Sequence, residues 1–155
     1  MTATAAPESI TVARANAPHV AVIGAGLAGL VTALRLRRAG ARVTLVTKGV
    51  GGLQLGHGTI DLLGYDPERV TNPAKGIEAF AAKHPEHPYA KIGVEAVRSG
   101  VELLSEILGE KLVNGSADEN VLVPTAVGAA RPTAFIPESM KAGVLHGDAK
   151  MVIIG

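Results

Sequence analysis

The sequence predicts an α/β fold that opens with a strand–helix–strand unit. Two apolar runs, His19–Ile23 and Val43–Val46, have the length and composition of strands, and a helical pattern lies between them from about Gly26 to Gly40. Glycines occupy the turn from the first strand into the helix. Since the unit takes about 30 residues, we expect parallel strands joined by a right-handed crossover.

Each element of this unit has its own local signals. The first strand is apolar at consecutive positions, Val20 to Ile23, as a central parallel strand with two covered faces requires. The helix carries an apolar face and ends in a basic turn that suits the helix dipole, and Gly40 is a suitable stop. The apolar positions are Leu27, Leu30, Val31, Leu34 and Leu36.

The glycines between strand and helix predict a ligand. Gly24, Gly26 and Gly29 form Gly-x-Gly-x-x-Gly: the first permits a tight turn, the second lets a phosphate approach the backbone, and the third lets the helix pack on the sheet. The helix N-terminus favours an anionic diphosphate. We therefore predict a Rossmann-like FAD- or NAD(P)-binding unit, whose candidate cofactor-binding loop comprises Gly24, Ala25, Gly26, Leu27, Ala28 and Gly29.

The residues after the second strand depart from the usual dinucleotide pattern. An acidic residue there normally holds the adenosine ribose, but Thr47 and Lys48 occupy the position. Three explanations stay open: Thr47 makes a weaker ribose hydrogen bond, Lys48 meets the 2′-phosphate of NADP, or the ligand is FMN, which has no adenosine ribose. We include both residues among the candidate cofactor-binding positions.

Beyond residue 48 we expect an irregular insertion of helices and short strands. Residues 49–64 form a glycine-rich loop over the ligand, with a short turn or helix near 60–63. Helices are predicted for 72–83, with Asn72 as cap and Pro73 at the first position, and for 92–108. Short strands are predicted at 112–114, 120–123 and 131–136, with a turn at Val127–Gly128. The polar candidates for contact with flavin or substrate are Gln54, His57, Thr59, Asp61, Arg131 and Lys141.

The composition and net charge exclude several classes of ligand and site. A net charge of +1 gives no electrostatic case for nucleic acid, and the absence of cysteine removes disulfides, thiolate metal sites and a cysteine nucleophile. No metal site is predicted, because His84 and His87 lack a third ligand close by, and His84–Tyr89 is interpreted as a rigid turn. No apolar run reaches the ~20 residues of a membrane span.

We make a different prediction for each end of the chain. Residues 1–18 are interpreted as a flexible tail without the features of a secretory signal, and residues 19–155 as the incomplete N-terminal part of one flavin-binding domain. Met151–Ile154 looks like a core strand just beginning. We therefore expect the chain to be a fragment of a longer protein.

Four stretches resemble the B subunit of anaerobic glycerol-3-phosphate dehydrogenase. They are GAGLAGLVTALRLRRAG with LVTKG, then GHGTIDLLG, PEHPYAKIG and VPTAVGAARPTAFIPESM. The first is common to many flavoproteins, whereas the other three in this order are more specific. The resemblance runs from about His19 to the end of the chain, and it adds Gly56, His57, Gly58 and Thr59 to the candidate cofactor-binding positions.

The resemblance implies a function in anaerobic glycerol catabolism. Members of the family oxidise sn-glycerol 3-phosphate to dihydroxyacetone phosphate and pass electrons to quinone. The B subunit carries a flavin, FMN by the usual attribution, whereas the glycine motif favours FAD. It pairs with a catalytic A subunit that binds FAD, and an iron–sulfur C subunit anchors both at the cytoplasmic face of the membrane. Family members also lack the acidic residue that usually binds the adenosine ribose, so Thr47 and Lys48 agree with the family pattern.

Two other interpretations remain open. Arg42 and Lys48, near the second strand, motivate a different flavin- or NADP-dependent oxidoreductase. The missing ribose acid, together with the lack of a recognisable catalytic group, motivates a non-catalytic module that docks a catalytic subunit. No acid or base is assigned from the sequence. The expected contribution of the protein to flavin chemistry is orientation and electrostatics rather than a side-chain nucleophile.

Overall fold

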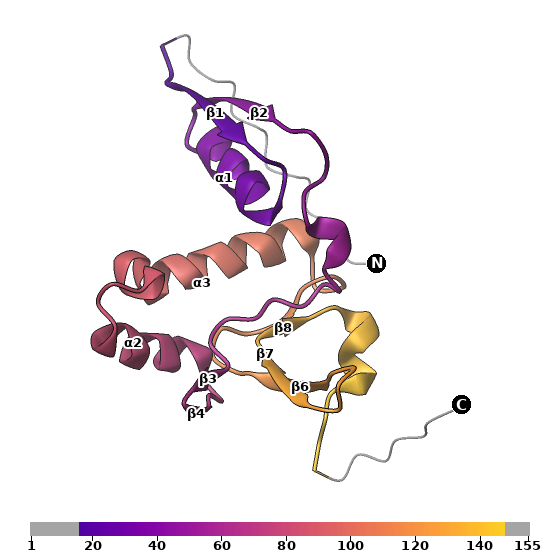
Figure 1. The fold of residues 1–155 in the computed structure, drawn as a ribbon. Coiled ribbons are helices and arrows are strands. Elements are labelled where there is room, and N and C mark those ends of the chain that lie inside the picture. The colour runs from indigo at the N-terminus through magenta and orange to yellow at the C-terminus, as the bar shows by residue number, and fades with distance from the viewer. Residues whose placement is uncertain (1–15, 148–155) are drawn as a thin grey trace, which may run out of the picture. The chain divides into compact units, whose positions relative to one another are not determined.

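The computed structural model describes residues 16–147 (Figure 1). These residues pack as two compact units, the first ending at His57 and the second beginning at Gly58. The division lies inside the single domain that was predicted for residues 19–155. The strand predicted at Met151–Ile154 lies outside the described residues.

The first unit is the predicted strand–helix–strand motif. Strand β1 (His19–Ile23) pairs in parallel with β2 (Arg42–Val46), with Val20 opposite Val43, and helix α1 (Leu27–Arg38) connects them. Three arginines stand in the last turn of α1, where positive charge interacts favourably with the helix dipole. Gly40 follows the helix with φ of 85°, a conformation that glycine adopts without strain. These elements confirm the predicted βαβ unit.

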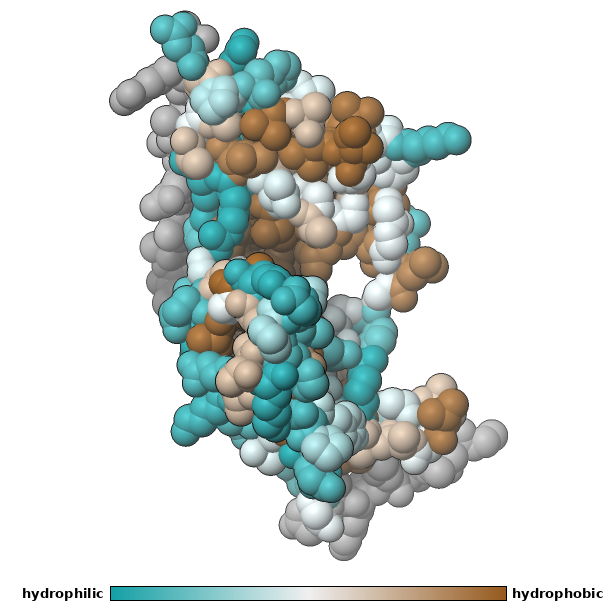
Figure 2. Space-filling view, turned by 60° about the vertical axis from the view of Figure 1, so that its left-hand side comes forward, coloured by the Kyte–Doolittle hydropathy of each residue, from teal (hydrophilic) through white to brown (hydrophobic). Residues whose placement is uncertain are grey.

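Apolar surface remains exposed on this unit. Within the described residues, Val22 and Ala41 are its buried hydrophobic side chains, and α1 has no buried residue. Ile23 is 85% exposed and Val46 50% exposed, and Figure 2 shows hydrophobic residues gathered on the surface of this unit. Since β1 has one neighbouring strand here, the central position predicted for it stays a prediction.

The glycine-rich loop differs from the expectation in one place. The short turn or helix predicted near residues 60–63 is wrong: a 3₁₀ turn, η1 (Leu53–Leu55), occurs earlier in the loop. Ile60 instead forms an antiparallel bridge with Phe135, so this segment is extended because it pairs with a distant strand. A hairpin of β3 (Tyr65–Asp66) and β4 (Glu68–Arg69) follows, in a segment for which no strand was predicted.

Two helices form the middle of the second unit. Helix α2 (Pro73–Lys83) has the predicted bounds, and the Asn72 side chain accepts a hydrogen bond from the Lys75 backbone N–H at 2.9 Å. Helix α3 (Pro88–Leu108) begins four residues before the predicted start. Its first turn is separated from the remainder by Gly93, whose φ of 77° and ψ of 161° are not helical. Gly109 ends α3, as predicted.

Short antiparallel pairs complete this unit. Strand β5 (Asn114–Gly115) pairs with β8 (Phe135–Ile136), and β6 (Val121–Pro124) pairs with β7 (Ala130–Thr133). The single strand predicted for 131–136 is therefore two strands with different partners. The turn at Val127–Gly128 is confirmed, with Gly128 at φ of 79°. The 3₁₀ segment η2 (Glu138–Gly143) follows.

A hydrophobic core holds α3 against these strands. It consists of buried side chains from α3, from the segment around β5 and from the β7–β8 region, with Ile60 and Leu62 packed beside them. Its buried members are Val101, Val113, Ala117, Ala134 and Phe135. The core therefore joins segments that are far apart in the sequence.

Candidate cofactor-binding site

The loop between β1 and α1 has the geometry that its glycines predict. Gly24 has φ of 104°, in the region that favours glycine, and its N–H donates to the Val46 carbonyl at 2.8 Å. A Cβ on Gly29 would lie 2.0 Å from the Gly24 carbonyl oxygen. The first glycine therefore permits the turn, and the third permits close packing of helix and loop.

Gly26 forms the open part of this loop. It is the N-cap of α1, with φ of −73° and ψ of 175°, and it supplies no side-chain cap to the helix. A Cβ built on Gly26 meets nothing within 4 Å, and the first turn of α1 contains no acidic residue. Space, backbone N–H groups and the positive end of the helix dipole thus coincide where a phosphate would bind. The residues present fit a diphosphate group.

Gly51 belongs to the same site, although it lies outside the Gly-x-Gly-x-x-Gly motif. It has φ of 64°, and a Cβ there would lie 2.8 Å from both the N and the Cα of Gly26. The segment after β2 therefore packs backbone to backbone against the glycine loop. The sequence did contain a signal for this contact. Gly51 and Gly52 follow the second strand closely, and adjacent glycines there are compatible with a close approach between two backbone segments.

Thr47 and Lys48 follow β2 at the edge where the glycine loop lies. The Thr47 hydroxyl donates to the Gly49 carbonyl and accepts from the Gly49 N–H at 3.0 Å, so it closes a local turn. A hydroxyl already engaged in this way contributes less to a ribose than a carboxylate would. Lys48 is exposed.

The second group of predicted residues is divided between the two units. Gly56 ends η1, and the exposed His57 is the last residue of the first unit. Gly58 and Thr59 belong to the second unit, where Gly58 has φ of 89° and a Cβ on it would lie 3.3 Å from Pro137. The structure therefore brings together the Gly24–Gly29 loop, Thr47 and Lys48 in one unit, and describes Gly58 and Thr59 in the other.

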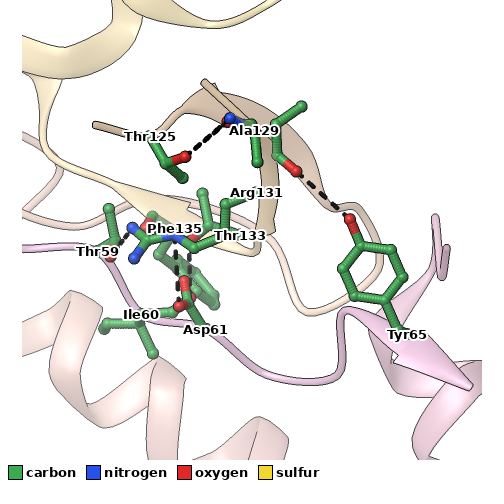
Figure 3. A network of polar contacts seen from close by, with 10 residues as sticks. Thr59, Ile60, Asp61, Tyr65, Thr125, Ala129, Arg131, Thr133 and Phe135 are labelled. Atoms are coloured by element: carbon green, nitrogen blue, oxygen red, sulfur yellow. Dashed lines mark hydrogen bonds and ion pairs between the residues drawn. The ribbon is translucent and has the colours of Figure 1, made fainter. Parts of the chain in front are cut away.

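A polar cluster in the second unit contains Thr59. The Arg131 Nη2 donates to the Thr59 hydroxyl at 2.9 Å, and the Arg131 Nε lies 3.7 Å from an Asp61 carboxylate oxygen (Figure 3). Beside them, the buried Thr133 hydroxyl lies 3.3 Å from the carbonyl oxygens of Ile60 and Phe135. Three of the polar candidates, Thr59, Asp61 and Arg131, are thus neighbours.

The other three polar candidates, His57 described above, Gln54 and Lys141, lie outside this cluster. Gln54 is in the 3₁₀ turn η1 of the first unit. Lys141 lies in η2, 3.5 Å from the Glu138 carboxylate, and both side chains are mostly exposed. Since an exposed ion pair of this kind contributes little to stability, Lys141 has no evident structural role.

Comparison with known proteins identifies the class to which this fold and loop belong. Residues 19–154 match the FAD binding domain family, and the chain belongs to that family. Several curated relatives are named as B subunits of anaerobic glycerol-3-phosphate dehydrogenase, so the resemblance predicted from the sequence is confirmed. No solved structure gives a significant match.

Three relatives illustrate the extent of the similarity. The protein from Halobacterium salinarum, named as a probable B subunit of this dehydrogenase, is 34% identical over 137 residues, covering 88% of this chain and 32% of its own length. The Yersinia enterocolitica protein is 37% identical over 145 residues, covering 88% and 34%. The Mannheimia succiniciproducens protein is 35% identical over 133 residues, covering 83% and 31%. The chain thus spans about a third of the length of these relatives.

The family confirms the α/β flavin-binding fold and the flavin cofactor, with FAD the form its description names. Among residues 16–147, no helix has both the length and the apolar character needed to cross a membrane.

Proposed function

We propose that this chain is the flavin-binding portion of one subunit of a quinone-linked dehydrogenase, which oxidises sn-glycerol 3-phosphate to dihydroxyacetone phosphate. The observation that carries the proposal is the glycine loop. Gly26 leaves open space at the N-terminus of α1, in a chain that belongs to the FAD-binding family and whose relatives are named for this dehydrogenase.

The role of the first unit is to hold and orient the flavin nucleotide. The backbone around Gly26 and the dipole of α1 bind the diphosphate, and Gly51 keeps the segment after β2 close to that loop. Thr47 stabilises the turn that presents Lys48 near the nucleotide. The flavin, when bound, supplies the electron-accepting chemistry, so the protein needs no side-chain nucleophile.

The second unit offers a cation for an anionic substrate. Arg131 is held between Thr59 and Asp61, which fixes the direction of its guanidinium group. A guanidinium is suited to phosphate, because it presents several N–H donors in one plane. We propose Arg131 as the group that attracts the phosphate of glycerol 3-phosphate, with Asp61 and Thr59 as positioning residues.

The proposal extends to an assembly. The relatives are named as B subunits, which implies an enzyme with further subunits. We propose a catalytic A subunit and an iron–sulfur C subunit as partners, with the complex at the cytoplasmic face of the cell membrane.

Identification of the cofactor tests the proposal. The full-length protein is purified with its presumptive partner, and the released cofactor is identified by chromatography and by absorbance near 450 nm. FAD or FMN supports the proposal. NADP alone would instead favour another oxidoreductase, and a cofactor-free protein that still binds the partner would favour a docking module.

A valine at Gly26 tests the phosphate site directly. Because a Cβ at this position meets no protein atom, Gly26→Val should leave the fold intact but crowd the diphosphate. We expect flavin affinity to fall at least about tenfold, or roughly 1.4 kcal/mol. Gly100→Val is the matched control, since it also enters open space but lies on α3. Equal flavin content in both variants and the parent would contradict a phosphate site at Gly26.

A further inference from the structure

The turn between α2 and α3 is built around two histidines and one phenylalanine ring. His84 ends α2, and its ring centroid lies 4.3 Å from that of Phe80. His87 precedes α3 and meets Phe80 edge to face, with centroids 4.8 Å apart. The His87 ring also lies 5.1 Å from Tyr89, which is partly buried, and this burial raises the pKa of Tyr89. The aromatic contacts fix the position of the His87 ring.

His87 also caps α3. Its backbone is extended, with φ of −70° and ψ of 146°, and its Nδ1 accepts a hydrogen bond from the Tyr89 backbone N–H at 3.2 Å. A histidine nitrogen accepts a hydrogen bond only when it carries no proton. The cap therefore requires a neutral imidazole whose proton is on Nε2.

The helical segment held by this cap is short. Gly93 interrupts α3 with φ of 77°, so the cap holds residues 88–92, about one turn. A single turn gains little from its own hydrogen bonds, and its stability depends on the cap and on the contacts of Tyr89. The loss of the cap would therefore be felt within this turn first.

We propose that His87 is a pH-sensitive cap that releases the first turn of α3 when its imidazole is protonated. A proton on Nδ1 replaces the acceptor by a donor that faces the Tyr89 N–H. It also places a positive charge at a helix N-terminus, where the dipole opposes it. The cap is complete while the imidazole is neutral and is lost when the imidazole takes up a second proton.

Neighbouring charged groups influence the protonation of the His87 imidazole. His84 lies on the same phenylalanine ring, and its own protonation adds a second positive charge that opposes protonation of His87. Glu86, which favours it, is engaged with Lys91 at 3.1 Å, and Lys83 at the end of α2 is engaged with Asp66 at 3.0 Å. An imidazolium gains some cation–π attraction to Phe80, but the neutral ring already makes that contact. By contrast, no new interaction replaces the hydrogen bond from the Tyr89 N–H to Nδ1.

Nuclear magnetic resonance of the imidazole nitrogens tests the first step. In the full chain at pH 8, His87 should show a non-protonated Nδ1 and a protonated Nε2. Tyrosine fluorescence then follows the turn, because the chain has no tryptophan and two tyrosines. In a Tyr65→Phe background, an acid titration should change the emission of Tyr89 with the same midpoint as the His87 nitrogen signals.

Three variants isolate the cap. His87→Asn supplies a non-titrating cap and should abolish the transition while keeping the turn. His87→Ala should leave the turn open at all pH values, with amide exchange at residues 89–92 about fivefold faster at pH 8. His84→Ala should keep the transition. A protonated Nδ1 at pH 8, or a transition that persists in His87→Asn, would overturn the proposal.

Discussion

In the first unit, a single residue, Gly51, determines whether the segment after β2 can approach the glycine loop. Its backbone lies against Gly26, and no other residue type has both the φ of 64° and the clearance that this contact needs. The glycine motif supplies a phosphate site only if the segment after β2 can approach it. Gly51 therefore belongs to the proposed cofactor site together with the glycines of the motif.

An alanine at Gly51 should weaken both the fold and cofactor binding. The left-handed conformation costs a non-glycine residue about 1–2 kcal/mol, and the new Cβ would also press on the backbone of Gly26. We expect a lower thermal midpoint and lower flavin affinity. Gly49→Ala is the control, because Gly49 has no positive φ and its Cβ enters open space. Calorimetry and flavin titration measure the two effects, and an unchanged Gly51→Ala protein would show that the close contact is not required.

At the scale of elements, the residues next to α2 determine where this helix begins. The Asn72 side chain accepts from the Lys75 N–H at 2.9 Å, and Pro73 occupies the first helical position. Asn72→Ala should reduce the free energy of unfolding by about 1 kcal/mol, because one backbone donor loses its partner. Asn72→Ser should keep most of this stability. Urea denaturation measures both, and equal stability of the two variants would contradict a capping role.

An ion pair ties α3 to the segment after β5 and predicts a pH dependence. Arg98 donates to both carboxylate oxygens of Asp118 at 2.6 and 2.8 Å. The hydrogen bond from Arg98 holds the pKa of Asp118 below its ordinary 3.8. A lowered pKa means that this stabilisation is complete above the ordinary value and is lost as the pH falls through the lower folded value.

The variant Arg98→Met should therefore be less stable than the parent at pH 7, with the difference shrinking once the pH falls below about 3.8. Because the pair is exposed, we expect a small effect that weakens further in high salt. Stability at several pH values, together with carboxyl chemical shifts of Asp118, measures it. A difference that is the same at pH 2 and pH 7 would mean that packing, and not charge, joins the two residues.

These elements also mark which parts of the fold the sequence could predict. The βαβ unit and α2 carry their signals locally: apolar periodicity, Asn72 before Pro73, and glycines at the turns. The bridge from Ile60 to Phe135 and the pairing of β5 with β8 depend on residues far apart, so composition within a window could not reveal them. For the site, the motif predicted the open position at Gly26 but not the contact of Gly51, which is likewise a tertiary contact.

At the scale of the whole molecule, burial is distributed unevenly. Ile77, Val123, Thr133 and Pro73 are the largest fully buried side chains among the described residues, and all belong to the second unit. The core cluster that contains Phe135 lies there as well. In the first unit, Val22 and Ala41 are the buried hydrophobic residues, while β1 exposes Ile23. Since buried apolar area dominates stability, the two units should differ in their resistance to opening.

Amide hydrogen exchange on the 155-residue chain should reveal this difference. We expect the amides of β1 and α1 to exchange faster than those paired between β6 and β7, because the first unit has little buried surface to lose on opening. Added FAD should slow exchange in the first unit, by up to about 100-fold at 100 times its dissociation constant, since binding stabilises the closed form by mass action. In Gly26→Val this protection should be at least about tenfold smaller at the same FAD concentration, while exchange in the second unit stays unchanged. Uniform exchange across both units, or equal FAD protection in the parent and Gly26→Val, would show that burial and the glycine loop do not govern the stability of this nucleotide-binding unit.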